Sequence, residues 1–197
     1  MRRPVIRLAA YGLVAALMMG AGAAVGAAGS PEDDAELRAA RAFAEKVGAY
    51  VSLQKAVVQK TSAKPSPASA SVIALRREGL ASELAAARRN VGQGEIFSPE
   101  VGDHFRRLIH HAFSGKQRRA MRRTIREDDH VRPVVLHVNA IYPESIPMTT
   151  MPPTLLRVLP VLPPELAYRI VGAALVLMDI RTNLIVDFLP DAIPGVR

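Results

Sequence analysis

The chain has 197 residues, of which 49% are hydrophobic and 22% are charged. This balance gives enough apolar mass for one core and excludes a chain that is disordered along its whole length. The chain contains no Cys, which excludes disulfide frameworks, thiolate zinc sites and a Cys nucleophile. Its formal net charge of +8 at pH 7 favours anionic partners over cationic ones.

The first 29 residues have the three-part pattern of an export signal. Arg2, Arg3 and Arg7 precede a run over 8–19 without a charged residue, and small residues follow over 20–29. This pattern predicts a signal peptide that is cleaved near its end. We therefore expect a periplasmic or secreted protein.

A second interpretation of the same segment is an uncleaved anchor in the inner membrane, because residues 8–28 are about 20 in number and long enough to cross a bilayer. Three of the 26 basic residues and none of the 18 acidic residues lie within 1–29, so the rest of the chain has a net charge of +5. Such a charge favours an anionic envelope component or an acidic protein as partner, through an attraction that salt screens. Nucleic acid is not an expected partner outside the cytoplasm.

A long first helix is predicted over about 31–60. Ser30 and Pro31 followed by three carboxylates are typical of a helix start. Apolar residues then recur at steps of three and four, which places them in one stripe. Core packing is the simpler interpretation of this stripe, and a homodimer through the 37–58 helix is the alternative. The stripe consists of Leu37, Ala40, Phe43, Ala44, Val47, Val51, Gln54 and Val58.

Three further helices are expected after a flexible linker near 61–71, which has two prolines in a Ser- and Ala-rich background. They run over about 72–91, 98–114 and 116–127. The helix over 72–91 is expected to pack through one face and to carry its arginines elsewhere. The face consists of Ile73, Leu80, Leu84, Ala87 and Val91, and the arginines are Arg76, Arg77, Arg88 and Arg89.

The composition changes after residue 129, because nine of the fifteen prolines lie from Pro133 to Pro190 inclusive. We divide the chain here into a helical region, 30–129, and a region over 130–197 that joins a Pro-rich connection to a β module. A strand is predicted over 134–138, a short helix near 152–156 and another strand over 168–171.

The last two strands are predicted to form a hairpin around 181–183, with Asn183 in the left-handed conformation. The register gives one entirely apolar face, which we expect to lie inside. Asp179 and Asp187 share the opposite, half-exposed face with Ile185. The apolar face consists of Val176, Met178, Ile180, Leu184, Val186 and Phe188.

A resemblance to known proteins spans most of the chain after residue 29, including 96–101 and 105–109, and it is strongest in the last sixty residues. It is carried mainly by four segments. They are Tyr-Pro-Glu at 142–144, Met-Pro-Pro-Thr-Leu-Leu at 151–156, Leu-Pro-Pro-Glu-Leu-Ala-Tyr-Arg-Ile-Val-Gly at 162–172 and Asp-Ile-Arg-Thr-Asn-Leu-Ile-Val-Asp at 179–187. In these segments the chain resembles a family of uncharacterised exported bacterial proteins, and its C-terminal β-hairpin module is similar to those of several small periplasmic proteins. The resemblance implies export and a reusable packing unit, and it implies no particular reaction.

Histidines are the first candidates for a metal site. His104, His110 and His111 lie beside Asp103 on one predicted helix. Helical ligand pairs need a spacing of three or four residues to meet on one face, and these positions do not provide it. We therefore expect no metal site and no cofactor.

Asp179 and Asp187 are the second candidates, because two nearby carboxylates share a proton or hold a cation. An envelope enzyme or a cation-binding protein that uses them, or the histidines, is therefore the alternative function. The other interpretation is that they hydrate one face of the sheet or pair with Arg169. No nucleophile elbow, phosphate loop or dinucleotide motif is present to support catalysis, and we assign no catalytic residue.

The basic segment over 116–127 is the third candidate. Its arginines follow helical spacing, and like charges at that spacing repel unless anions offset them. A solvated face with internal ion pairs is the simpler interpretation, and a surface that binds an anion or a partner is the alternative. The arginines are Arg119, Arg122, Arg123 and Arg126.

The sequence therefore predicts an α+β protein with about four N-terminal helices and a small antiparallel β module. Functionally, we expect a non-catalytic periplasmic or envelope binding protein.

Overall fold

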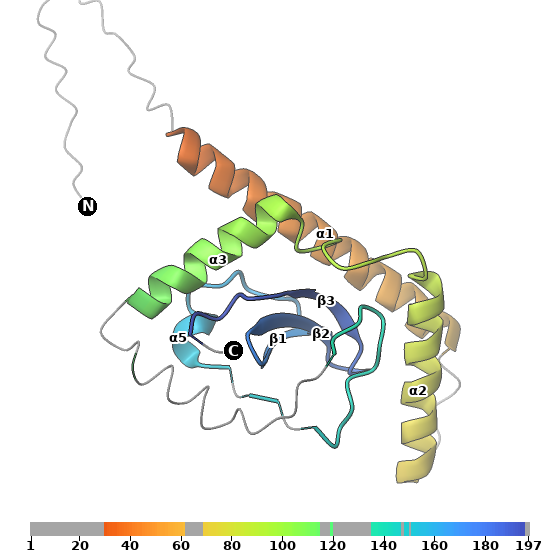
Figure 1. Ribbon diagram of the computed structural model, residues 1–197. Coiled ribbons are helices and arrows are strands. Elements are labelled where there is room, and N and C mark those ends of the chain that lie inside the picture. The colour runs from red at the N-terminus through yellow and green to blue at the C-terminus, as the bar shows by residue number, and fades with distance from the viewer. Residues whose placement is uncertain are drawn as a thin grey trace, which may run out of the picture.

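The computed structural model describes residues 30–61, 69–114, 119, 135–146, 148–149 and 151–195. Within these ranges, four helices precede a three-stranded antiparallel sheet, which confirms the predicted α+β class (Figure 1). The export signal over 1–29, most of the linker near 61–71 and most of the predicted helix over 116–127 lie outside the described residues. The elements are α1 (Pro31–Thr61), α2 (Ala70–Ala87), α3 (Pro99–Ser114), α5 (Pro153–Leu156), β1 (Leu166–Val171), β2 (Ala174–Asp179) and β3 (Ile185–Leu189).

Helix α1 begins where the sequence predicts. The Asp33 backbone N–H donates to Ser30 Oγ at 3.2 Å, and the Ser30 N–H donates to Asp33 Oδ2 at 3.1 Å, a reciprocal cap that satisfies free donors of the first turn. Four residues of the predicted stripe are buried, namely Phe43, Val47, Val51 and Gln54, together with Tyr50, which the stripe did not include. Leu37 and Ala44 are exposed. The homodimer through 37–58 stays a prediction.

The strand order is β1-β2-β3. Gly172, at φ +54°, begins the two-residue turn between β1 and β2, as a hairpin of this length requires. Asn183 has φ +56°, which confirms its predicted left-handed conformation. A β-bulge between Leu177 and Met178 shifts the pairing of β2 with β3.

The bulge also changes the predicted faces. Met178 pairs with Ile185, and both lie in the core on one side of the sheet, whereas Val186 lies with Leu177 in the core on the other side. The prediction that Val186 shares a face with Met178 is therefore wrong, because one additional residue in a strand reverses the side on which the next side chains lie.

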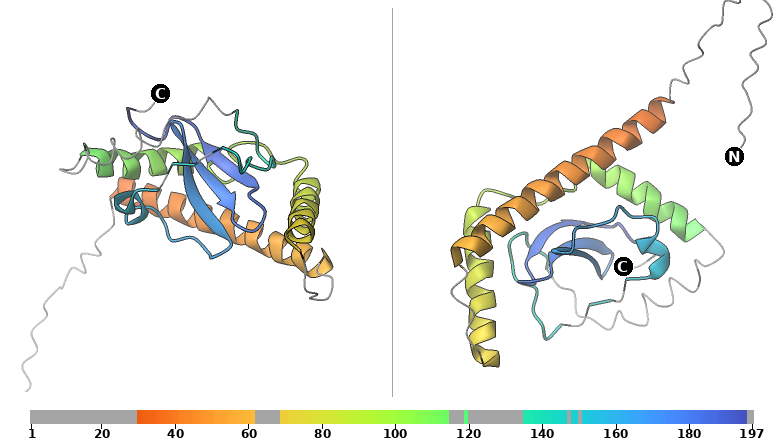
Figure 2. Two further views of the ribbon diagram at one scale, coloured as in Figure 1. Left: turned by 90° about the horizontal axis from the view of Figure 1, so that it is seen from below. Right: turned by 180° about the vertical axis from the view of Figure 1, so that it is seen from behind.

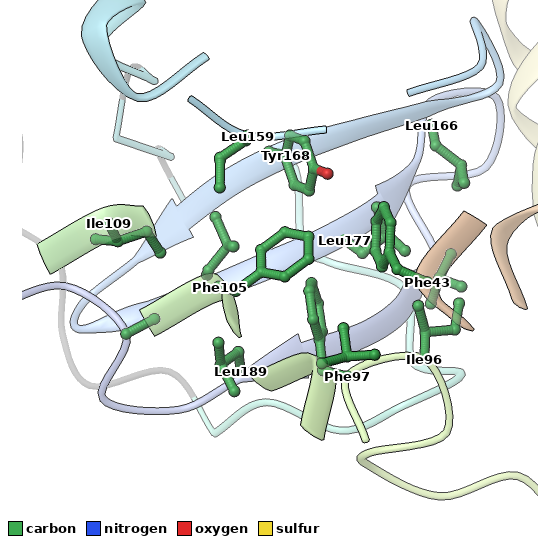
Figure 3. Packing of buried hydrophobic residues seen from close by; sticks show 14 of the residues in the cluster. Phe43, Ile96, Phe97, Phe105, Ile109, Leu159, Leu166, Tyr168, Leu177 and Leu189 are labelled. Carbon is green, nitrogen blue, oxygen red and sulfur yellow. The ribbon is translucent and has the colours of Figure 1, made fainter. Parts of the chain in front are cut away.

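The larger core lies between one face of the sheet and helices α1 and α3 (Figures 1 and 3). Aromatic rings fill its centre. The Phe43 and Phe105 centroids are 4.8 Å apart, and Phe97 meets Phe105 edge-on at 5.1 Å. Burial of such rings is the main source of stability in a core of this size.

The second face of the sheet is covered by residues of the described ranges 135–146 and 148–149. Tyr142 is buried there against Val176 and Met178. The predicted strand over 134–138 is wrong for its described residues, which have no regular structure. Backbone hydrogen bonds between this segment and the hairpin begin at Asn139, after the predicted strand. The Asn139 N–H donates to the Ile185 carbonyl at 2.8 Å. Both faces of the sheet are thus covered.

Helix α2 stands at one end of the sheet and packs through its C-terminal half. Leu80 and Leu84 are buried against Val57 of α1 and Leu184 of the hairpin. The N-terminal half extends past the end of α1 (Figures 1 and 2). Ile73, which the sequence placed on the packed face, is therefore 59% exposed. No helix in the described part of the chain is long and apolar enough to cross a membrane.

Candidate functional site

The basic segment is described only at Arg119, which is helical and exposed. Arg122, Arg123 and Arg126 lie outside the described residues. The expectation that these arginines bind an anion or a partner stays a prediction.

Asp179 is fully buried at the end of β2. Its Oδ2 accepts hydrogen bonds from Tyr50 Oη at 2.8 Å and Gln54 Nε2 at 2.6 Å, both from α1. Its Oδ1 accepts from the backbone N–H groups of Arg181 and Thr182 and from the Thr182 hydroxyl, each at 2.9 Å. Asp179 therefore fixes the hairpin loop and joins it to α1.

Asp187 is also fully buried, and it faces the loop between α2 and α3. Its carboxylate accepts from the N–H groups of Gly94 at 3.0 Å, Ile96 at 2.7 Å and Phe97 at 2.8 Å, and from the next residue in β3, Phe188. A single side chain thus provides the acceptors for three donors of an irregular loop, which would otherwise be buried without a partner.

The expected exposure of these two carboxylates is wrong, because the helices and the loop cover their face of the sheet. Pairing with Arg169 is also wrong, since Arg169 lies opposite Val176 and therefore on the other face. A carboxylate has about four lone-pair sites, and each carboxylate already has at least four protein donors. The arrangement is suited to holding elements together.

A buried arginine completes this region. Arg88, which the sequence placed away from the packed face, donates to Asn139 Oδ1 at 2.7 Å and to the Val186 carbonyl at 2.9 Å. Its guanidinium carbon lies 5.0 Å from the centroid of the Tyr50 ring, a cation–π distance. The spacing offered a signal, because Arg88 follows Leu84 by four residues and so continues the buried face.

Burial shifts the pKa values of Arg88 and Tyr50. It lowers the pKa of Arg88, because removal from water disfavours the charged guanidinium. It also raises the pKa of the Tyr50 hydroxyl, and the neighbouring Asp179 carboxylate raises that pKa further. Tyr50 therefore remains a neutral donor to Asp179.

The histidines on α3 do not converge. His104 is buried, and its Nδ1 has no partner among the described residues, while His110 and His111 are exposed. Burial lowers the pKa of His104. No group of three or more His, Cys, Asp or Glu residues within the described ranges is placed to hold a metal ion.

Among the described residues, two of the cavities are open to solvent and contain arginines. One has a volume of about 480 Å³ at the C-terminal end of α3 and is lined by Arg106, Arg107, His110, His111, Ser114 and Asp191. Its arginines already have partners, because Arg106 pairs with Asp103 at 3.2 Å and Arg107 pairs with Glu36 at 3.7 Å.

The other cavity has a volume of about 620 Å³ and lies between the last turn of α1, the first half of α2 and the hairpin loop. We call it the α1–α2 cavity. Its lining includes the apolar side chains Val58, Ile73 and Leu80 and three arginines, Arg76, Arg77 and Arg181, and no Asp or Glu is among its described lining residues. The sequence analysis missed this site, because its lining comes from three segments that only the packing of α2 brings together.

The arginines of the α1–α2 cavity differ in their partners. Arg77 pairs with Glu144 of the segment that covers the sheet. Arg76 and Arg181 form no ion pair with any residue that the structure describes. Both guanidinium groups lie at the edge of an apolar cavity. A backbone hydrogen bond lowers the pKa of Glu165, and the charge of Arg181 lowers it further without forming an ion pair.

A comparison of the chain with protein-family models, with curated proteins and with solved structures finds no match. The resemblance to exported bacterial proteins stays a prediction, and the functional argument depends on the site itself.

Proposed function

We propose that the protein is a non-catalytic binding protein of the periplasm or envelope that holds an anionic amphiphile in the α1–α2 cavity. The observation that carries this proposal is the combination of an apolar lining with Arg76 and Arg181, which have no described ion-pair partner. A ligand with a phosphate or carboxylate head and an alkyl chain matches this lining, because the head can bind the arginines and the alkyl chain can contact the apolar side chains. The guanidinium fork binds such heads through two parallel hydrogen bonds.

The size of the cavity supports a small ligand. Its volume of about 620 Å³ lies within the range of about 300–1,000 Å³ that is usual for small-molecule sites. The positive net charge of the chain adds a long-range attraction for anions. The alternative function, an enzyme or a cation-binding protein that uses Asp179, Asp187 or the histidines, has no comparable support.

Titration calorimetry with dodecyl phosphate below its micelle concentration tests the proposal. We expect one binding site, and about tenfold or greater weakening by Arg76→Gln or Arg181→Gln, because each removes a charged hydrogen bond. Arg89→Gln is the matched control, since Arg89 is exposed just after α2 and outside the cavity lining. Inorganic phosphate and dodecyl maltoside, which each offer half of the ligand, should bind more weakly. Equal affinity in all three variants, or no binding, would contradict the proposal.

The basic segment is tested separately by a pull-down from envelope extracts at low and high salt. If it binds a partner, changing Arg119, Arg122, Arg123 and Arg126 to Gln removes the captured protein. Capture that is unchanged in this variant would assign the arginines to a solvated face.

A further inference from the structure

Glu144 lies just outside the α1–α2 cavity and holds one of its three arginines. Its carboxylate forms an ion pair with Nη1 of Arg77 on α2. Its Oε1 also accepts a hydrogen bond at 3.4 Å from Nδ2 of Asn183 in the hairpin loop. Glu144 is therefore held between α2 and the hairpin loop, which both contribute to the lining, although it is not itself among the described lining residues.

The three arginines of the cavity differ in the charge that they offer to a ligand. The positive charge of Arg77 is offset by the Glu144 carboxylate, whereas Arg76 and Arg181 form no ion pair with a described residue. An anionic head group in the cavity would be attracted by all three guanidinium groups and repelled by Glu144. The sum corresponds to two positive charges instead of three.

The ion pair between Arg77 and Glu144 is open to solvent. The two side chains are 34% and 61% exposed, respectively. Ion pairs at exposed positions contribute little to stability, because water and salt screen them and both side chains lose conformational freedom. Removal of the Glu144 charge should therefore change the electrostatics of the cavity and leave the fold intact.

We propose that Glu144 acts as an internal counter-ion of Arg77 and so limits the preference of the α1–α2 cavity for doubly charged over singly charged head groups. This inference rests on the proposed function, because it concerns the same cavity. Coulomb energy is proportional to the product of the charges. Loss of the Glu144 charge should thus favour a head with two negative charges twice as much, in binding free energy, as a head with one.

The test compares the full chain with its Glu144→Gln variant by titration calorimetry at about pH 8, with three ligands below their micelle concentrations. Dodecyl maltoside is neutral and dodecanoate has one negative charge. Dodecyl phosphate has two, because the second pKa of a phosphate monoester is about 6. Gln keeps the length of the side chain and an oxygen that accepts from Arg77 and Asn183, so the substitution removes little besides the charge.

We expect Glu144→Gln to leave the affinity for dodecyl maltoside unchanged, to raise that for dodecanoate about threefold and to raise that for dodecyl phosphate about ninefold. The second factor is the square of the first because the charge is doubled, and both factors should decrease at high salt. Glu100→Gln is the matched control, since Glu100 also forms an exposed ion pair, with Arg38. Arg38 is about 30 Å along α1 from Val58 of the cavity, so this control should leave all three affinities unchanged.

Three outcomes would overturn the inference. Equal gains for all three ligands would show that the substitution loosens the cavity instead of changing its charge. An unchanged affinity for dodecyl phosphate in Glu144→Gln, together with the expected loss in Arg76→Gln, would refute the role of Glu144 and leave the proposed function in place. No binding of either anionic ligand by the wild type and by Glu144→Gln would refute both.

A double variant tests whether Arg77 is the group that Glu144 offsets. Arg77→Gln with Glu144→Gln removes one positive and one negative charge together, so its affinity for dodecyl phosphate should be at or below that of the wild type. A gain as large as that of Glu144→Gln alone, with helicity unchanged in circular dichroism, would contradict the assignment of Glu144 as the counter-ion of Arg77.

Discussion

Two polar regions of this protein have opposite arrangements. At Asp179 and Asp187, charged side chains are fully buried and their acceptor sites are occupied by protein donors. In the α1–α2 cavity, Arg76 and Arg181 line an open volume and have no ion-pair partner in the described chain. A satisfied buried charge contributes to the specificity and stability of a fold, whereas an unpaired cation beside an apolar surface is available to a ligand. The comparison therefore separates a structural region from a binding region.

The largest effect that tests this comparison is expected at Asp187. Asp187→Ala leaves the N–H groups of Gly94, Ile96 and Phe97 without their acceptor, so the free energy of unfolding should fall by about 3–5 kcal/mol. Urea denaturation followed by circular dichroism measures this change. Glu45→Ala, at an exposed position of α1, is the control and should change stability by less than about 0.5 kcal/mol. A similarly small loss at Asp187 would contradict a structural role.

A smaller effect is expected at Asp179, whose donors are distributed between α1 and its own loop. Asp179→Asn should lower the free energy of unfolding by about 2–3 kcal/mol, and Tyr50→Phe by about 1 kcal/mol. The two losses should not be additive, because Tyr50 donates directly to Asp179. Additive losses would show that the hydrogen bond contributes nothing.

The smallest effect is expected at a third kind of polar group, the buried His104 side chain. Its Nδ1 has no hydrogen-bond partner among the described residues. Burial lowers the pKa of His104, Glu36 of α1 raises it and Arg107 lowers it, with burial as the largest cause. The unfolded chain then binds a proton more readily than the folded chain, so stability should decrease as the pH falls below about 6.5.

Denaturation midpoints at about pH 7.5 and about pH 5.5 bracket the ordinary histidine pKa. His104→Leu should reduce the difference between the two midpoints, and His111→Gln, at an exposed position, should leave it as in the wild type. An unchanged difference in His104→Leu would assign the pH dependence to other groups.

Much of the local structure was predictable from the sequence. The cap of α1 at Ser30, the start of α3 at Pro99 and the left-handed Asn183 all follow from short-range rules, and each is present. These features depend on neighbouring residues, which is why local patterns identify them.

The site was less predictable, because it depends on tertiary packing. The period of two along the hairpin placed Asp179 and Asp187 together, but it contained no information about the loop and helix that cover them. The bulge that moves Val186 had no clear signal in sequence. The α1–α2 cavity results from α2 extending past α1, a consequence of helix lengths and packing that no single segment encodes.

The most direct test of the binding region is chemical-shift mapping with dodecyl phosphate on the isotopically labelled chain. The account predicts that the Nε–H signals of Arg76 and Arg181 and the methyl signals of Ile73 and Leu80 move as ligand is added, while the amide signals of Gly94 and Ile96 beside Asp187 do not. Changes confined to the Gly94 and Ile96 amides, or no change at the arginines, would contradict the account.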